Sequence, residues 1–112
     1  MKLLIVSDSH GDRRALERTV NAEPDAAAVI FVGDGTRDAE ALQDARPALR
    51  LYLVRGNCDF ASFAPTVALA PFGGALFFYT HGHLYDVKSG LDGLARAAAE
   101  RGASAALFGH TH

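Results

Sequence analysis

Short apolar runs alternate along the first half of the chain with segments whose apolar residues recur at helical spacing. The runs Lys2 to Ser7, Ala28 to Gly33 and Leu49 to Gly56 predict three strands. Residues 12–22 and 37–45 between them predict two amphipathic helices. Because the strand runs are apolar on both faces, we expect buried, parallel strands in an α/β fold.

The pattern changes after the third run. The sequence PFGG interrupts the apolar segment Thr66 to His81, which predicts a β-hairpin with antiparallel strands. A last strand is predicted over Ser104 to His110. Since no repeat or linker interrupts these elements, we expect one domain over residues 1–112.

A third helix is predicted over residues 89–103, between the hairpin and the last strand. Ser89 is the expected N-cap, Arg101 lies in the expected last turn, and Gly102 is expected to end the helix.

Five of the predicted strands end in polar clusters, namely SDSHGD, GDG, RGNCD, THGH and GHTH. In open α/β sheets the carboxyl ends of the strands face one crevice, where ligands bind. The sequence therefore predicts that residues far apart along the chain converge at one place. These residues are Asp8, His10, Asp34, Asn57, His81, His110 and His112.

Carboxylate, amide and imidazole donors of this kind suit divalent ions such as Mn²⁺, Fe²⁺, Ni²⁺ or Zn²⁺. One ion takes about four to six ligands, so seven donors favour two ions that share a bridging carboxylate. Pairs of metal ions roughly 3.5–4 Å apart activate water and stabilise the attacking and leaving oxygens in phosphoryl chemistry. The clusters thus point to a dinuclear centre for phosphoester chemistry.

Each cluster alone has a simpler interpretation. DSHG is typical of a strand-to-helix turn in which Asp8 or Ser9 caps the next helix, GDG and GNCD are turn sequences, and the histidines could be solvated. Coincidence argues against this interpretation, because unrelated turns would not place His, Asp or Asn at five strand ends while leaving only His83 unused.

The amino-acid composition limits the classes of molecule that the protein is expected to bind. The net charge is −2 and no Lys/Arg cluster occurs, so neither nucleic-acid nor anionic-membrane binding is indicated. Bound metal ions would supply the positive field that an anionic substrate needs. The single Cys58 excludes an intrachain disulfide, and no apolar stretch approaches a signal peptide or a membrane span. We therefore expect a cytoplasmic protein.

The five motifs resemble, in order, the signatures of the calcineurin-like metallophosphoesterases, and most closely the small phosphodiesterases of the YfcE type. They are DSH at Asp8 to His10, GD at Gly33 and Asp34, GNCD at Gly56 to Asp59, HGH at His81 to His83 and GHTH at Gly109 to His112. The resemblance covers the whole chain. It implies a four-layer α/β/β/α sandwich with two sheets inside and helices outside.

The resemblance also implies residue roles for a phosphodiesterase that acts on a small phosphoester. The first of two divalent ions, Mn²⁺ foremost or Fe²⁺, Ni²⁺ or Zn²⁺, is expected to bind four residues, of which one bridges to the second. A hydroxide between the ions would attack phosphorus in line. The expected ligands are Asp8, His10, Asp34 and His112 for the first ion, and the bridging Asp34 with Asn57, His81 and His110 for the second.

Residues around these ligands receive lesser roles. Asn57 is expected to help orient the phosphate, Asp59 to support the ligands, and His83 to support them or contact substrate. Many relatives have GNH where this chain has GNC, and that histidine can protonate the leaving oxygen. Cys58 is a poorer general acid near pH 7, so we expect good leaving groups unless His83 or water substitutes.

Relatives continue past GHTH with further strands of the second sheet. We therefore expect this chain to be a fragment of a longer protein, or one whose missing layer a partner or a second copy supplies. The Thr66 to His81 hairpin is then expected to stand nearly alone, and the inner face of the first sheet to lose cover. The terminal carboxylate of His112 would be an additional potential metal ligand.

Two other functions compete with the enzyme. The retromer subunit of the same family uses this scaffold for protein interaction, but such a change should erode the ligands, and all seven are present here. A two-component receiver domain requires an Asp after the third strand and a Lys after the fifth. The chain offers only Asp59, placed late, and has His81 where that Lys should be.

Overall fold

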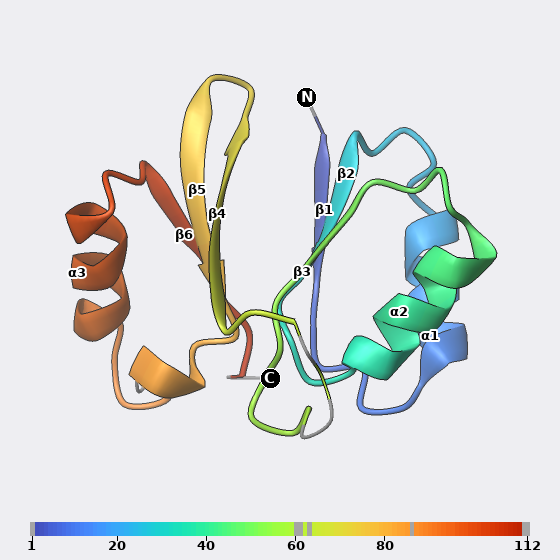
Figure 1. Ribbon diagram of the computed structural model, residues 1–112, viewed down its shortest axis with the longest axis horizontal. Coiled ribbons are helices and arrows are strands. Elements are labelled where there is room, and N and C mark those ends of the chain that lie inside the picture. The colour runs from blue at the N-terminus through green and yellow to red at the C-terminus, as the bar shows by residue number, and fades with distance from the viewer. Residues whose placement is uncertain (1, 60–61, 63, 86, 111–112) are drawn as a thin grey trace.

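The computed structural model describes residues 2–59, 62, 64–85 and 87–110, which form two sheets packed face to face with helices on both outer sides (Figure 1). Helices α1 and α2 cover the outer face of the first sheet, and α3 covers that of the second. The predicted α/β/β/α layering is therefore observed. The elements are β1 (Leu3–Val6), α1 (Arg13–Asn21), β2 (Ala28–Phe31), α2 (Thr36–Ala45), β3 (Leu51–Leu53), β4 (Val67–Phe72), β5 (Ala75–Thr80), the 3₁₀ helix η1 (His83–Tyr85), α3 (Asp92–Glu100) and β6 (Ala105–Leu107).

The first sheet has the order β1-β2-β3 and is parallel throughout, as its apolar runs predict. Ile5 pairs with Ile30 and Val29 with Leu51, and every residue of the central strand β2 is buried. Right-handed parallel connections through helices require both faces of such a sheet to be covered, which explains why β2 is the most apolar strand. The parallel arrangement also places three carboxyl ends at one edge.

The loop after β1 does not cap α1 in the way the DSHG turn suggested. Asp12 is the N-cap, and its Oδ1 accepts a hydrogen bond of 3.0 Å from the backbone N–H of Ala15. Ser9 instead donates its hydroxyl hydrogen to Asp38 Oδ2 at 2.5 Å. Asp8 and Ser9 are therefore not needed for helix capping, which leaves Asp8 available for another role.

The predicted hairpin is present, with β4 and β5 antiparallel in the second sheet. Phe72 pairs with Ala75, so the loop is only Gly73 and Gly74, which have φ values of +58° and +84°. Two consecutive left-handed residues make the tight turn that matches the twist of a hairpin, and glycine adopts this conformation without strain.

The expectation of a nearly isolated hairpin is wrong. β6 pairs in parallel with β5, and Tyr79 lies opposite Leu107, so the second sheet has three strands in the order β4-β5-β6. The long connection through α3 is what permits this parallel pairing. Two sheets, one of them containing a hairpin, also exclude the receiver domain, which has a single parallel sheet.

Helix α3 begins later than predicted. It starts at Asp92, because residues 87–89 form a turn before it. The N-cap residue is Leu91, which makes no side-chain cap bond. Ser89 is therefore not the N-cap. At the other end the helix stops at Glu100, so Arg101 is the C-cap and does not belong to the last turn, whereas Gly102 has the left-handed φ of +73° expected of a residue that ends a helix.

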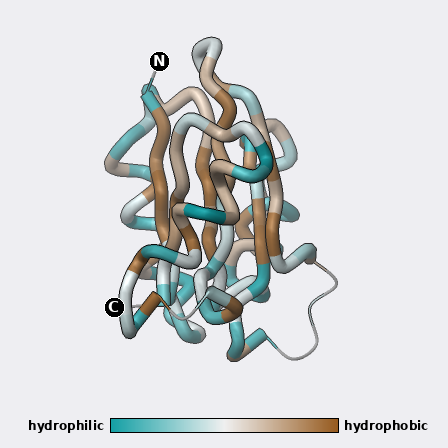
Figure 2. The backbone as a smooth tube through the Cα atoms, turned by 90° about the vertical axis from the view of Figure 1, so that its left-hand side faces the viewer, coloured by the Kyte–Doolittle hydropathy of each residue, from teal (hydrophilic) through white to brown (hydrophobic). Residues whose placement is uncertain are grey.

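The space between the two sheets is the main core. Ile30, Val32 and Val54 of the first sheet and its loops pack against Phe72 and Tyr79 of the second. The strands form the hydrophobic centre of the molecule in Figure 2, with more polar loops around them. The inner face of the first sheet is thus covered over its centre, contrary to expectation.

Cover is incomplete at the sheet edges. Ile5 follows Leu3 on the inner face of the edge strand β1, yet 44% of its surface is exposed. Leu69 on the edge strand β4 is exposed to the same extent. None of the helices in the described ranges is both long and apolar enough to cross a bilayer.

The contact between the second sheet and α3 gives a stability prediction. Phe78 is fully buried against Leu94, Ala97 and Ala98, so Phe78→Ala should lower the free energy of unfolding by about 3–5 kcal/mol. Urea denaturation followed by circular dichroism measures the change. Leu69→Ala, on the outer part of the adjacent strand, is the matched control and should cost far less. Equal losses in the two variants would contradict this packing.

Candidate metal centre

The carboxyl ends of strands from both sheets meet at the lower end of the molecule in Figure 1. Hydrogen bonds join the loops there, both within the second sheet and across the two sheets. The N–H of Gly109, after β6, donates to the carbonyl of His81, after β5, at 3.0 Å. The N–H of His110 donates to Asp8 Oδ2, after β1, at 3.2 Å. The convergence predicted from a single crevice therefore arises from two sheets.

Five of the seven predicted donors form one cluster at this end. His81 Nε2 lies 3.2 Å from Asp34 Oδ2 and 3.1 Å from His110 Nδ1. His10 Nε2 lies 3.6 Å from Asp8 Oδ1 and 3.7 Å from Asp34 Oδ2. Asp34 is thus central, with one imidazole on each side. Asp34, His81 and His110 also satisfy the spacing of a metal site, with ligand atoms within 4.8 Å of one another.

The ring of His81 is fixed in one tautomer. Its Nδ1 lies 2.8 Å from the carbonyl oxygen of Val32, and His81 is completely buried. A carbonyl can only accept, so Nδ1 of the neutral ring carries the hydrogen and Nε2 presents a lone pair toward Asp34. Histidines that bind metals are commonly held by a backbone carbonyl in this manner. A lone pair facing a carboxylate oxygen fits a cation between them.

The backbone at the cluster is unusual. Among the described residues, four that are not glycine have positive φ, and all four belong to the predicted donor set. Left-handed backbone is uncommon outside glycine, although Asp, Asn and His tolerate it better than most. Such conformations concentrate at functional sites, where the surrounding structure enforces them. The four residues are Asp8 at +57°, His10 at +46°, Asp34 at +60° and His110 at +71°.

Glycines in the motifs allow the loops to approach closely. A Cβ on Gly33 would lie 2.7 Å from the backbone nitrogen of Gly56 and 2.8 Å from His81 Nδ1. A Cβ on Gly56 would collide with the carboxylate of Asp34. These two positions therefore need glycine because the second and third loops are in van der Waals contact around Asp34.

Asp59 holds the loop that carries Asp34. Its two carboxylate oxygens accept hydrogen bonds of 2.8–3.1 Å from four backbone N–H groups, those of Asp34, Gly35, Thr36 and Gly56. Burial opposes the charge of Asp59, but these backbone donors outweigh it and keep its pKa below the usual range. Asp59 is therefore a charged brace that joins the loops after β2 and β3.

A second brace was not predicted from the sequence. Asp38, in the first turn of α2, is buried and accepts bonds from the Ser9 hydroxyl and from the Gly11 N–H at 3.0 Å. These contacts fix the loop that presents Asp8 and His10. The only signal in the sequence was an acidic residue in the first turn of a predicted helix, which normally indicates a favourable dipole interaction.

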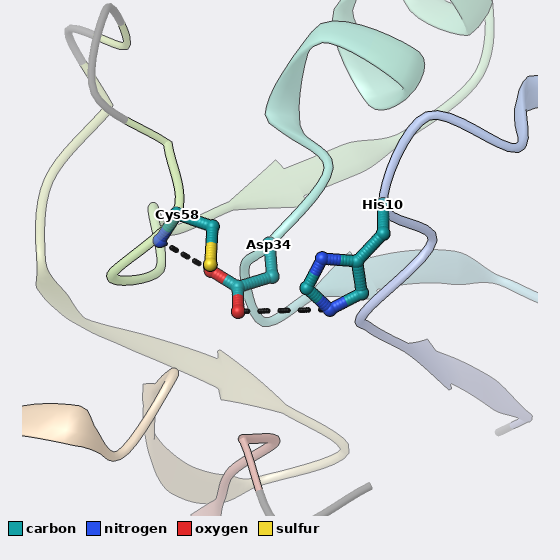
Figure 3. A group of neighbouring side chains, drawn as sticks. All are labelled: His10, Asp34 and Cys58. Carbon is teal, nitrogen blue, oxygen red and sulfur yellow. Dashed lines mark hydrogen bonds and ion pairs between the residues drawn. The ribbon is translucent and has the colours of Figure 1, made fainter.

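Cys58 lies against Asp34 on the exposed side of the cluster (Figure 3). The Cys58 N–H donates to Asp34 Oδ1 at 2.8 Å. The ligand atoms of His10, Asp34 and Cys58 also lie within 4.8 Å of one another. Burial of the sulfur, followed by the nearby carboxylate of Asp34, raises the pKa of the Cys58 thiol.

The remaining predicted residues differ in placement. Asn57 is exposed in the turn after β3, beside Cys58. The ring centroid of His83 lies 5.6 Å from that of His81 and 6.4 Å from that of His110, and its Nδ1 is buried without a hydrogen-bond partner. Burial, with the neighbouring imidazole of His81, lowers the pKa of both His83 and His110. His112 lies outside the described residues.

A cavity of about 600 Å³ opens beside the cluster. His10, Asp34 and Cys58 line the side next to the cluster, and Arg37 of α2 lies on its wall. Cavities of roughly 300–1,000 Å³ are typical of small-molecule sites. The cluster therefore borders a space large enough for an organic group.

The whole chain, residues 1–112, matches the family model described as the calcineurin-like phosphoesterase superfamily domain. A probable metallophosphoesterase of Bacillus subtilis, YsnB, is 38% identical over 113 residues. The match covers all of this chain and 64% of that relative.

Solved structures agree. A conserved uncharacterized protein of Streptococcus pneumoniae, described as a predicted phosphoesterase, is 31% identical with a TM-score of 0.78, over 96% of this chain and 60% of that one. The Escherichia coli phosphoesterase Yfce is 25% identical with a TM-score of 0.61, over 79% and 61%. Vacuolar protein sorting 29 of Cryptosporidium parvum has a TM-score of 0.78 over 98% and 64%, but its 18% identity shows only a common fold.

This chain thus spans 64% of the length of its curated relative and about as much of the solved structures. The family match extends over every residue, the TM-score of 0.78 shows that the fold is shared with a similar solved structure, and the donor cluster lies where the described parts of the five motifs meet. The chain belongs to the calcineurin-like phosphoesterase superfamily.

Proposed function

We propose that the chain hydrolyses phosphoesters with the aid of two divalent metal ions, and that its preferred substrates are small phosphodiesters. One observation carries this proposal: His81 Nε2 lies 3.2 Å from the buried Asp34 Oδ2, and the rings of His10 and His110 lie next to this pair. Family membership and the neighbouring cavity support it.

The donor types and their crowding fit metal ions. Asp34, His81 and His110 would hold one ion, and Asp8 and His10 would hold the other together with Asp34. Asn57 and His112 complete the proposed ligand set, as the motifs predict. When bound, such a pair of ions supplies an activated water and neutralises charge on the phosphate oxygens.

The chain's own residues have separate tasks in this proposal. Asp59 and Asp38 keep the ligand loops in position before substrate arrives, so that little reorganisation is required. Asn57, exposed beside the cluster, orients the phosphate. Cys58 and His83 are the candidate donors of a proton to the leaving oxygen, and the 600 Å³ cavity next to Cys58 accommodates the leaving group.

A protein-interaction role, suggested by the likeness to vacuolar protein sorting 29, is the second candidate. That likeness concerns the fold alone. The left-handed backbone at Asp8, His10, Asp34 and His110 favours the enzyme, since an interaction scaffold gains nothing from this strain.

Metal analysis separates the two candidates. After incubation with Mn²⁺ and removal of excess ion, mass spectrometry of the eluted metal should give about two ions per chain. Asp34→Asn should lose both, because Asp34 is proposed to bridge them, whereas Asp44→Asn on the exposed end of α2 should lose neither. A metal-free wild-type chain after this treatment would contradict the proposal.

Hydrolysis is the direct test. Bis(p-nitrophenyl) phosphate and p-nitrophenyl phosphate should be cleaved with Mn²⁺ and not with excess chelator. His110→Ala should reduce turnover by at least about 100-fold, because loss of even an outer partner of a metal site costs 10–100-fold. Circular dichroism verifies that the variant is folded. Activity that is indifferent to chelator and to this substitution would refute a metal mechanism.

A third prediction concerns the leaving group. Imidazole titrates near pH 6.5 and a thiol near 8.5, so Cys58→His should increase the turnover of a diester with an alkyl leaving group at pH 7. Diesters with a nitrophenolate leaving group should respond much less, because they need no proton. The ratio of the two rates is the measurement, and an unchanged ratio would contradict protonation from this position.

A further inference from the structure

We infer that Cys58 is a metal ligand: its Sγ, with His10 and Asp34, forms a mixed sulfur, nitrogen and oxygen site that selects thiophilic divalent ions such as Zn²⁺ and Co²⁺ over Mn²⁺. The inference rests on the proposed function only in placing an ion at His10 and Asp34. It adds an eighth donor to the seven ligands expected from the motifs, and it gives the site a metal preference that carboxylates and imidazoles alone would not give.

Geometry is the first support. The ligand atoms of His10, Asp34 and Cys58 lie within 4.8 Å of one another (Figure 3). Bonds of about 2.0–2.3 Å to one ion allow donors up to roughly 4.5 Å apart, so a small side-chain adjustment brings all three into contact with a single ion. Three donors of three chemical types thus lie close together on the lining of the cavity.

The backbone holds the sulfur in this position. The Cys58 N–H donates to Asp34 Oδ1, while the Asp59 carboxylate joins the next residue of the chain to the backbone of Asp34. Two consecutive residues after β3 are therefore attached to the loop after β2. This attachment leaves Oδ2 of Asp34 directed to the histidines, where His10 Nε2 lies 3.7 Å away.

Ligand chemistry gives the preference. Sulfur is a soft donor that favours Zn²⁺ and similar ions, whereas Mn²⁺ favours oxygen. When the metal–sulfur bond forms, it replaces the S–H bond and the proton leaves to solvent, since the thiolate is the form that binds metal. A metal-bound Cys58 has no proton for the leaving oxygen, so that task then falls to His83 or to water. Cys58 is exposed, so both the ion and the released proton have access to water.

Cobalt spectroscopy tests the inference on the 112-residue chain. A Co²⁺–thiolate bond produces a charge-transfer band in the near ultraviolet, which imidazole and carboxylate ligands do not produce. We expect this band in the wild type and its loss in Cys58→Ser, while the visible Co²⁺ bands persist. The matched control adds Ser104→Cys to Cys58→Ser, which restores an exposed thiol at the amino end of β6, and should not restore the band.

Metal competition gives a second measurement. The ratio of Zn²⁺ to Mn²⁺ affinity, determined by equilibrium dialysis, should fall at least about tenfold in Cys58→Ser, because even outer partners of metal ligands change affinity by 10–100-fold. Visible Co²⁺ bands without the near-ultraviolet band in the wild type would overturn the inference, as would an unchanged affinity ratio.

The outcomes for the proposed function are separate. A chain that shows the thiolate band but does not hydrolyse any phosphoester supports the metal ligand and refutes the enzyme. A chain that hydrolyses diesters with Mn²⁺ but lacks the band refutes the ligand alone.

Discussion

The carboxylate of Asp59 is the contact on which the rest of the site depends. It gathers four backbone N–H groups from two loops that follow different strands, and it thereby fixes Asp34 between them. Asp34 in turn contacts the imidazoles of both His10 and His81, and Asp8 contacts the same two rings. The four hydrogen bonds offset the cost of desolvating the partly buried Asp59 carboxylate, and the field of this negative charge also favours cations nearby. Asp59 therefore positions Asp34, and Asp34 lies between the loops that carry the other candidate ligands.

The two sheets contribute unequally to this organisation. The first supplies the carboxylates and the braces, and the second supplies the buried imidazole of His81 and the backbone N–H of His110. The contacts between them near the site include those of the His81 ring with the Val32 carbonyl and of the His110 N–H with Asp8 Oδ2. The apolar core of Ile30, Val32 and Tyr79 thus sets the separation between the two halves of the cluster. The packing between the two sheets therefore also fixes the distances between the side chains of the cluster.

Much of this arrangement could be predicted from residue patterns, because strand runs, hairpin glycines and polar strand ends each have a local cause. The pairing of β6 with β5 could not, since it depends on α3 packing across the sheet rather than on the sequence of either strand. Ser89 had the composition of a cap but not the position, because a turn intervenes before α3. Asp38 and the sulfur of Cys58 gain their roles only through neighbours more than 20 residues away. Local signals locate the ligands, and long-range contacts decide what surrounds them.

The hydrogen bond between His81 Nδ1 and the Val32 carbonyl oxygen affects which side of the cluster is open to solvent. Its hydrogen is directed into the core, where no solvent can collect it, and its other nitrogen faces Asp34. Solvent reaches the cluster from the exposed side, where Cys58 and His10 border the cavity. The fold therefore separates a buried half of the cluster, which holds the His81 ring in position, from an exposed half, which can exchange protons with solvent.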